Sequence, residues 1–150
     1  ARGIVASHDC ELCATDGGSL VLRNDELRVV LVDDADHPGF CRVIWNAHVR
    51  EMTDLQPPQI ARLMRAVFAV EGAVRAVLAP QKINLASLGN LTPHLHWHVI
   101  PRYETDAHFP RPVWAERLRE EDAGGRDIRR TKLDTLAAEI RTRLPDAPVG

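Results

Sequence analysis

Apolar residues recur at every third or fourth position between residues 59 and 79, which is the spacing of one buried helix stripe. Pro57 and Pro58 precede this stretch and fit the first turn of a helix, where no backbone hydrogen bond is lost. Pro80 follows the stretch and would end the helix. The pattern therefore predicts one long helix near the middle of the chain. Its stripe consists of Ile60, Leu63, Met64, Val67, Val70, Val74, Val77 and Leu78.

Shorter apolar runs on both sides of this helix have the length of strands. Residues 19–40 predict two strands around the polar turn Asn24-Asp25-Glu26, and "CRVIWN" predicts a third. After the helix, "KINLASL" and "HLHWHVIP" predict a fourth and a fifth strand. Because the strands cluster and do not alternate with helices, we expect an α+β fold with a largely antiparallel sheet of about five strands. A final helix at about 128–144 is predicted by Leu133, Leu136, Ala137, Ile140 and Leu144.

The composition narrows the class of protein. The chain has 150 residues, 45% of them hydrophobic and 27% charged, which fits one ordinary soluble globular domain. A formal net charge of -2 and the lack of a dense Lys/Arg block argue against a nucleic-acid-binding protein, although a few local donors could hold a small anion. No apolar run approaches the roughly 20 residues that cross a bilayer, and the N-terminus lacks the apolar core of a secretion signal. A cytoplasmic protein without a membrane segment is therefore expected.

Three histidines alternate with apolar residues in "HLHWHVI", at positions 94, 96 and 98. Successive side chains of a strand point to opposite faces, so the three imidazoles are expected on an accessible face and the residues between them in the core. Imidazole titrates near neutral pH, can attack phosphorus and binds metals. The run is therefore compatible with ordinary residues of a half-buried strand, with ligands of a catalytic metal, or with a nucleophile and its supporting groups.

The run "HLHWHVI" resembles the His-φ-His-φ-His-φ-φ signature of the histidine triad (HIT) family of nucleotide hydrolases and transferases, in which φ is apolar. The resemblance covers roughly residues 10–103 and includes the paired cysteines, the aspartate before a "PG" loop, "AHVREMTDL" and the long helix. "HFPRPVWA" is similar to a bacterial branch labelled diadenosine-tetraphosphate hydrolase-like. The resemblance implies a single HIT-like domain over residues 1–150, with 104–150 as a C-terminal extension, and a two-fold homodimer.

The same resemblance implies a role for each triad histidine. His96 would attack the α-phosphorus of a nucleotide and form a nucleotidyl-histidine intermediate, which water or another acceptor then resolves. His98 would contact the phosphate oxygens, and His94 would orient His96. The implied activity is hydrolysis or transfer at the α-phosphate of a dinucleoside polyphosphate or a nucleoside phosphoramidate. The chemistry itself needs no metal, although Mg²⁺ could accompany a polyphosphate substrate.

Four residues outside the triad matter by the same resemblance. Asn90 stands where many relatives carry a glutamine, so it is a candidate donor to phosphate or to the leaving group. Asp33 matches a position that commonly accepts hydrogen bonds from ribose, and Asn84 is a further candidate for the nucleotide pocket. Phe40 departs from the family, because many members carry there a histidine that can hydrogen-bond. This departure leaves open a nucleotide-binding or sensing module without turnover.

Cys10 and Cys13 form a CxxC pair, which alone is compatible with a metal site, a redox pair or coincidence. Structural zinc takes four ligands in a tetrahedral arrangement. Some HIT relatives hold zinc with two such cysteines, a histidine at the position of His48 and the first triad histidine. We therefore expect a structural zinc site on Cys10, Cys13, His48 and His94, which would fix the N-terminal segment against the active-site strand.

Overall fold

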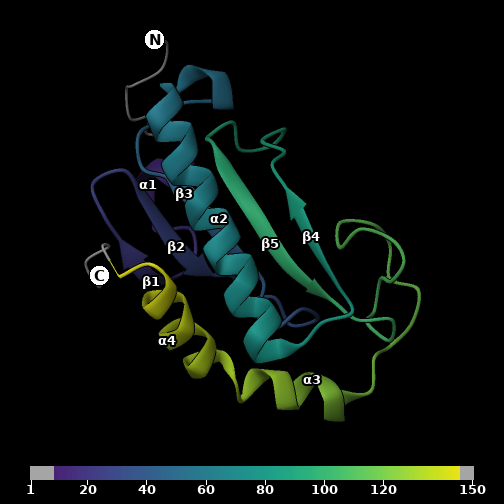
Figure 1. The fold of residues 1–150 in the computed structure, drawn as a ribbon. Coiled ribbons are helices and arrows are strands. Elements are labelled where there is room, and N and C mark those ends of the chain that lie inside the picture. Colours follow the sequence, from purple (N-terminus) through teal and green to yellow (C-terminus); the bar gives the residue numbers. More distant parts are fainter. Residues whose placement is uncertain (1–8, 146–150) are drawn as a thin grey trace.

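A five-stranded antiparallel sheet forms the centre of the structure, a computed structural model that describes residues 9–145 (Figure 1). The strands lie in the order β1-β2-β3-β5-β4, and each neighbouring pair is antiparallel. The predicted α+β class and sheet are therefore confirmed. The strands span Ser19–Arg23 (β1), Leu27–Leu31 (β2), Cys41–Trp45 (β3), Lys82–Ala86 (β4) and His96–Arg102 (β5).

The predicted long helix is α2, which spans Pro57–Leu78 and lies along one face of the sheet (Figure 1). A 3₁₀ turn, η1 (Met52–Asp54), precedes it, and Gln56 and Gln59 form a capping box at its start. The helix ends where Ala79 adopts the left-handed conformation, with φ of 47°. The predicted stripe is confirmed, because Leu63, Val67, Val70, Val74 and Leu78 are buried and Ile60, Met64 and Val77 pack against them.

The predicted C-terminal helix is present, but it begins at Leu133 and not at 128, and a separate helix precedes it. Helix α3 spans Ala123–Arg130 and helix α4 spans Leu133–Arg143. Only α4 carries the apolar stripe, which packs against α2, whereas Ile128 of α3 is 59% exposed. The stripe does not continue into α3, so nothing holds the two segments in one straight helix. No helix within residues 9–145 is both long and apolar enough to cross a membrane.

Different hydrophobic clusters pack against the two faces of the sheet. On one face, Val43 of β3 belongs to the main hydrophobic core, together with the buried stripes of α2 and α4. On the other face, a smaller cluster joins Val30 and Ile44 to Leu12 of the short helix α1 (Glu11–Ala14), which the sequence did not indicate. The N-terminal segment therefore covers part of the sheet face opposite α2.

Arg28 of β2 fixes this N-terminal segment over the sheet. Its Nη2 donates to the carbonyl oxygens of Leu12 and Thr15, at 2.6 and 3.1 Å, and its Nε donates to that of Asp16 at 2.9 Å. Arg28 is 3% exposed. Backbone carbonyl oxygens that are removed from water need hydrogen-bond donors, and Arg28 supplies them to the segment that it holds in place.

Candidate active site

Only two of the three triad histidines lie within strand β5. The strand begins at His96, and His94 lies just before it. The prediction that the three imidazoles occupy an accessible face is wrong, because His94, His96 and His98 are only 0%, 7% and 5% exposed. They lie on the face of the sheet that α1 partly covers. Burial by a segment distant in the sequence cannot be predicted from the alternating pattern of one strand.

The proton of the His96 ring can be assigned from a backbone contact. Nδ1 of His96 lies 2.5 Å from the carbonyl oxygen of His94. A carbonyl oxygen only accepts hydrogen bonds, so we assign the proton to Nδ1. Burial lowers the pKa of His96; the hydrogen bond to His94 raises it and the charge of Arg42 lowers it further. The neutral ring therefore has a free lone pair on Nε2, which is the form that a nucleophile requires.

His98 packs between two aromatic side chains. Its ring centroid lies 5.4 Å from that of Phe40, edge to face, and 5.1 Å from that of Trp114. Burial lowers the pKa of His98 to about 3, with smaller contributions from His96 and Arg42, so the imidazole is neutral at physiological pH. Its Nδ1 is buried and has no hydrogen-bond partner among the described residues. The neighbouring phenyl ring of Phe40 cannot supply one.

A pocket with a volume of ≈ 340 Å³ opens beside His96 and His98, within the size range of small-molecule sites. Its wall carries these two buried imidazoles and the half-buried side chain of Arg42. Its rim carries three exposed apolar side chains, Leu88, Leu91 and Trp114, which are 55%, 99% and 52% exposed, and the exposed amide of Asn90. The pocket therefore combines polar groups at depth with an entrance that is mostly apolar. The residues that line it are Arg42, Leu88, Gly89, Asn90, Leu91, Thr92, His96, His98 and Trp114.

The predicted nucleotide-binding residues separate in the structure. Asn90 lines the triad pocket. Asn84 accepts a hydrogen bond of 2.7 Å from Arg102 and lines a neighbouring hollow of ≈ 590 Å³, which shares Trp114 with the triad pocket. Asp33 is exposed in the loop after β2 and lines neither of these two pockets. The structure thus brings Asn90 to the triad, and leaves Asn84 and Asp33 outside its pocket.

The four predicted metal ligands lie together, with their ligand atoms all within 4.8 Å of one another. Sγ of Cys13 lies 3.3 Å from Nδ1 of His48 and 3.5 Å from Nδ1 of His94, and Sγ of Cys10 lies 3.5 Å from the latter. Zinc bonds of ~2.3 Å to sulfur and ~2.0 Å to nitrogen, at the tetrahedral angle, separate sulfur and nitrogen by about 3.5 Å. The cluster therefore fits a tetrahedral metal ion.

The orientation of His94 agrees with a ligand role. Its Nε2 lies 2.5 Å from the carbonyl oxygen of Trp45, which can only accept, so the proton belongs on Nε2. This leaves the lone pair of Nδ1 directed at the two cysteines. Metal-binding histidines usually donate their second ring N–H in this way, which fixes the tautomer and the direction of the ring.

Sequence reasoning missed a second buried histidine pair. Nε2 of His37 lies 2.9 Å from Nδ1 of His108, and both side chains are buried. Asp106 adjoins them, but its carboxylate already accepts hydrogen bonds from Arg102 and from backbone N–H groups. We therefore interpret the group as an anchor that ties the segment after β5 to the loop before β3. His108 opens the stretch "HFPRPVWA", but nothing in that stretch indicates a partner 71 positions away in the sequence.

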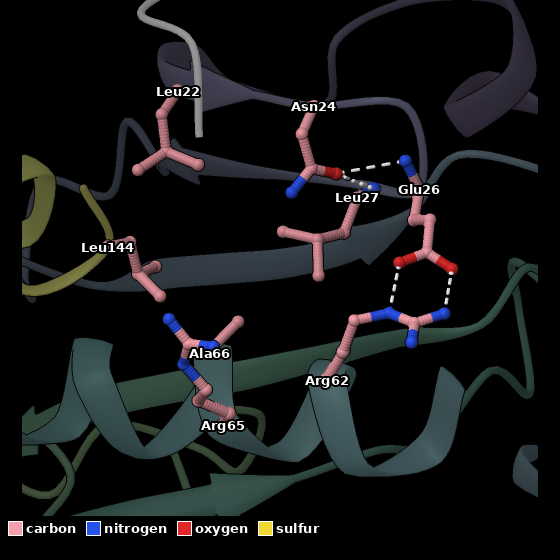
Figure 2. Close-up of a pocket in the computed structure, with 8 residues that line it drawn as sticks. All are labelled: Leu22, Asn24, Glu26, Leu27, Arg62, Arg65, Ala66 and Leu144. Carbon is pink, nitrogen blue, oxygen red and sulfur yellow. Dashed lines mark hydrogen bonds and ion pairs between the residues drawn. The ribbon is translucent and has the colours of Figure 1, made fainter. Parts of the chain in front are cut away.

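Figure 2 shows a different pocket, which lies between the β1–β2 turn and α2. Arg62 reaches across it to Glu26, with hydrogen bonds of 2.5 and 2.7 Å to the two carboxylate oxygens. Its volume of ≈ 130 Å³ is below the roughly 300 Å³ of small ligand sites. Among residues 9–145, no histidine or cysteine lines it, so these residues offer neither an imidazole or thiol nucleophile nor soft metal ligands. The triad pocket is the better candidate for chemistry.

A sequence model of the HIT domain matches residues 16–105, a range that contains all five strands and the three triad histidines. The chain belongs to the HIT domain family. The resemblance drawn from "HLHWHVI" is therefore confirmed. The matched range ends before α3 and α4, so these helices lie beyond the part that defines the family.

Individual relatives agree with this membership. The AP-4-A phosphorylase of Mycobacterium tuberculosis is 31% identical over 98 residues, which are 61% of this chain and 50% of that protein. The chain thus spans about half the length of the curated relatives it matches. A histidine triad protein from Bradyrhizobium japonicum has 29% identity and a TM-score of 0.67, covering 85% of this chain and 91% of that one. A zinc-bound histidine triad family protein from Mycobacterium smegmatis shares the fold, with 20% identity, a TM-score of 0.58, and 87% and 96% coverage.

Proposed function

We propose that this HIT protein is a nucleotide hydrolase or nucleotidyl transferase that acts at the α-phosphate through a nucleotidyl-His96 intermediate. The observation that carries the proposal is the contact between Nδ1 of His96 and the carbonyl oxygen of His94. The same His96 ring lines the triad pocket. This contact leaves Nε2 as the free nucleophilic atom. The AP-4-A phosphorylase relative supports a nucleotide with a polyphosphate chain as substrate, and a nucleoside phosphoramidate is the second candidate.

In the proposed reaction, the Nε2 lone pair of His96 forms a bond to the α-phosphorus while the bond from phosphorus to the leaving group breaks. The leaving group departs with the bonding electrons, as a phosphate or nucleotide anion or as an amine that takes up a proton. The adduct ring is cationic, and the His94 carbonyl stabilises it through the Nδ1 proton. Water then attacks phosphorus and loses a proton, and the P–N bond breaks to release nucleoside monophosphate and neutral His96.

Two further residues of the pocket have proposed roles in this reaction. Asn90 and His98 line the same pocket as His96 and are suited to donate hydrogen bonds to phosphate oxygens. Asn84 and Asp33 lie outside that pocket, so their contacts with the nucleoside stay predictions from the family resemblance. A long substrate could reach Asn84, because its hollow and the triad pocket share Trp114.

Two other functions make different predictions. A catalytic metal held by the triad is disfavoured, because Nδ1 of His94 faces the cysteines and Nδ1 of His96 is occupied by a backbone carbonyl. A nucleotide sensor without turnover is the second candidate function, and it is favoured by Phe40, which packs on His98 without a hydrogen bond.

The deciding experiment compares the wild type with His96→Ala against a panel of dinucleoside polyphosphates and phosphoramidates. We expect the wild type to release nucleoside monophosphate and the variant to bind the same nucleotide without releasing product. Equal binding without turnover by either protein would favour the sensor. Turnover that survives in His96→Ala but is abolished by a chelator would favour metal catalysis. Thermal unfolding of both proteins checks that the variant keeps the fold.

We also propose that Cys10, Cys13, His48 and His94 hold a structural zinc ion. The sulfur–nitrogen distances and the donation from His94 to Trp45 support this site, and a HIT protein of the same fold is zinc-bound. Bound there, zinc would tie α1 to β5 beside the pocket, and it would take no part in bond making. Mg²⁺ stays a prediction that depends on a polyphosphate substrate. The two-fold homodimer stays a prediction from the family resemblance, and the cytoplasmic location stays a prediction from the sequence.

A further inference from the structure

Arg42 is a charged residue that neither the histidine motif nor its proposed chemistry accounts for. It lies on β3, where its neighbours Cys41, Val43 and Ile44 are fully buried apolar residues. In the antiparallel pairing of β3 with β5, Arg42 is directly opposite His98. Residues that pair in this way project from the same face of a sheet. The guanidinium therefore lies on the histidine side, and Arg42 lines the same pocket as His96 and His98.

The guanidinium of Arg42 is held in place by Nη1, whereas its Nε has no hydrogen-bond acceptor among the described residues. Nη1 donates to the carbonyl oxygen of Gly17 at 2.9 Å. Nε is buried and has no hydrogen-bond partner among the described residues. A buried donor that stays unpaired costs free energy, so a buried N–H beside a pocket indicates a partner that arrives with the ligand.

The segment that holds Arg42 is itself tightly constrained. Gly17 has φ of +82°, which residues with a side chain rarely adopt. A Cβ at this position would also lie 2.7 Å from Cδ2 of Leu12 and 2.9 Å from Cδ1 of Ile44. The backbone carbonyl of Gly17 can therefore approach the sheet and orient the guanidinium only because no side chain is present.

The pocket needs a positive charge that its histidines do not supply. A nucleotide brings at least one negative charge on its α-phosphate, and His98 is neutral because burial lowers its pKa to about 3. Arg42 is the only lysine or arginine among the described residues that line the pocket. A guanidinium stays charged in proteins and offers several donors in one plane, which suits phosphate oxygens.

We propose that Arg42 is a phosphate-binding residue, whose guanidinium pairs with the phosphoryl oxygens of the nucleotide next to His96. This inference rests on the proposed function, because the phosphate belongs to the nucleotide on which His96 would act. Arg42 supplies the permanent charge, whereas Asn90 and His98 supply neutral donors.

The test separates phosphate recognition from general damage to the pocket. The four common nucleoside monophosphates are titrated against the wild-type protein by calorimetry, and the tightest one and its nucleoside are then compared in Arg42→Gln and Arg42→Lys. Arg75→Gln is the matched control, because Arg75 is exposed on α2, on the opposite side of the sheet, and its loss removes the same charge. Thermal unfolding reports whether each variant folds.

We expect Arg42→Gln to weaken binding of the monophosphate about 10- to 100-fold, the size of a hydrogen-bonded charge contact. Binding of the nucleoside is expected to change less than about threefold, and Arg75→Gln is expected to bind both ligands like the wild type. Unchanged monophosphate binding, or an equal loss for monophosphate and nucleoside, would overturn the inference. If Arg42→Gln does not fold, the same comparison with Arg42→Lys decides.

The outcomes also separate this inference from the proposed function. If the wild type binds none of the monophosphates, both the proposed function and the role of Arg42 are wrong. If the wild type binds a monophosphate and forms the His96 intermediate, yet Arg42→Gln binds the monophosphate equally well, only the role of Arg42 is wrong. If Arg42→Gln selectively loses monophosphate binding but the wild type shows no turnover, the role of Arg42 is supported and the proposed catalysis is not.

Discussion

Replacing Asp106 by asparagine should destabilise the protein more than any change of a surface charge. The Asp106 side chain is 0% exposed and accepts five hydrogen bonds. Two come from Nε and Nη2 of Arg102, at 2.9 and 3.2 Å, and three come from the backbone N–H groups of Tyr103, His108 and Phe109, at 2.8 to 3.0 Å. Asparagine keeps the shape but offers one acceptor oxygen, and its NH₂ group would face a donor.

The magnitude can be worked from the same contacts. Burial raises the pKa of Asp106, but the hydrogen bonds from Arg102 and the backbone outweigh it and lower the pKa from 3.8 to about 2. That difference corresponds to about 2 kcal/mol of stability from the charged form. Asparagine also leaves the buried Arg102 without its ion partner, although Arg102 keeps its hydrogen bonds to Asn84 and Arg111. We expect a total loss of about 3 kcal/mol, or roughly 6 to 12 °C in Tm.

The pH dependence provides a second readout. The folded pKa lies below the unfolded value, so the contribution of Asp106 is complete above pH 3.8 and is lost as the pH falls towards about 2. Urea unfolding between pH 7 and pH 2.5 should therefore show a wild-type stability advantage that shrinks in this acid range. Asp36→Asn is the control, because Asp36 pairs with Arg117 near the surface and should contribute below about 1 kcal/mol. A loss under 1 kcal/mol for Asp106→Asn at pH 7 would refute the reasoning.

Two further predictions concern the metal site and a glycine of the fold. Protein purified without added metal should contain about one zinc per chain by elemental analysis, and Cys13→Ser should contain much less; near-zero metal in the wild type would reject the site. Gly39→Ala should lower the free energy of unfolding by about 3 kcal/mol in urea titrations, because Gly39 has φ of +94° and a Cβ would lie 2.3 Å from Cδ1 of Leu78. A loss below 1 kcal/mol would contradict this reasoning.

Local patterns predicted the elements that depend on neighbouring residues. The stripe of α2 and the runs that form β1 to β5 could be located because burial in each repeats with the period of its own backbone. The motif located the triad, and the family resemblance completed the Cys10–Cys13 pair with two distant histidines, which the structure brings within ligand distance. The family and the fold were therefore predictable from the sequence.

The remaining features depend on register and on contacts between distant segments. Arg42 is conspicuous as the one charged residue in "CRVIWN", but its position opposite His98 follows only from the pairing of β3 with β5. His37 and His108 are 71 positions apart, and no local pattern connects them. The burial of the triad and the separation of α3 from α4 likewise depend on what packs against each segment. Periodicity within one segment contains none of this information.

The central claim is that Nε2 of His96 forms a covalent bond to phosphorus. The most direct test mixes the wild-type protein with a nucleoside phosphoramidate that it turns over, quenches the reaction within milliseconds, and measures intact mass and peptide masses. We expect the added mass of one nucleotidyl group on the peptide that contains His96, and none in His96→Ala. Steady product release with no adduct at any quench time, or an adduct on a different residue, would contradict the claim.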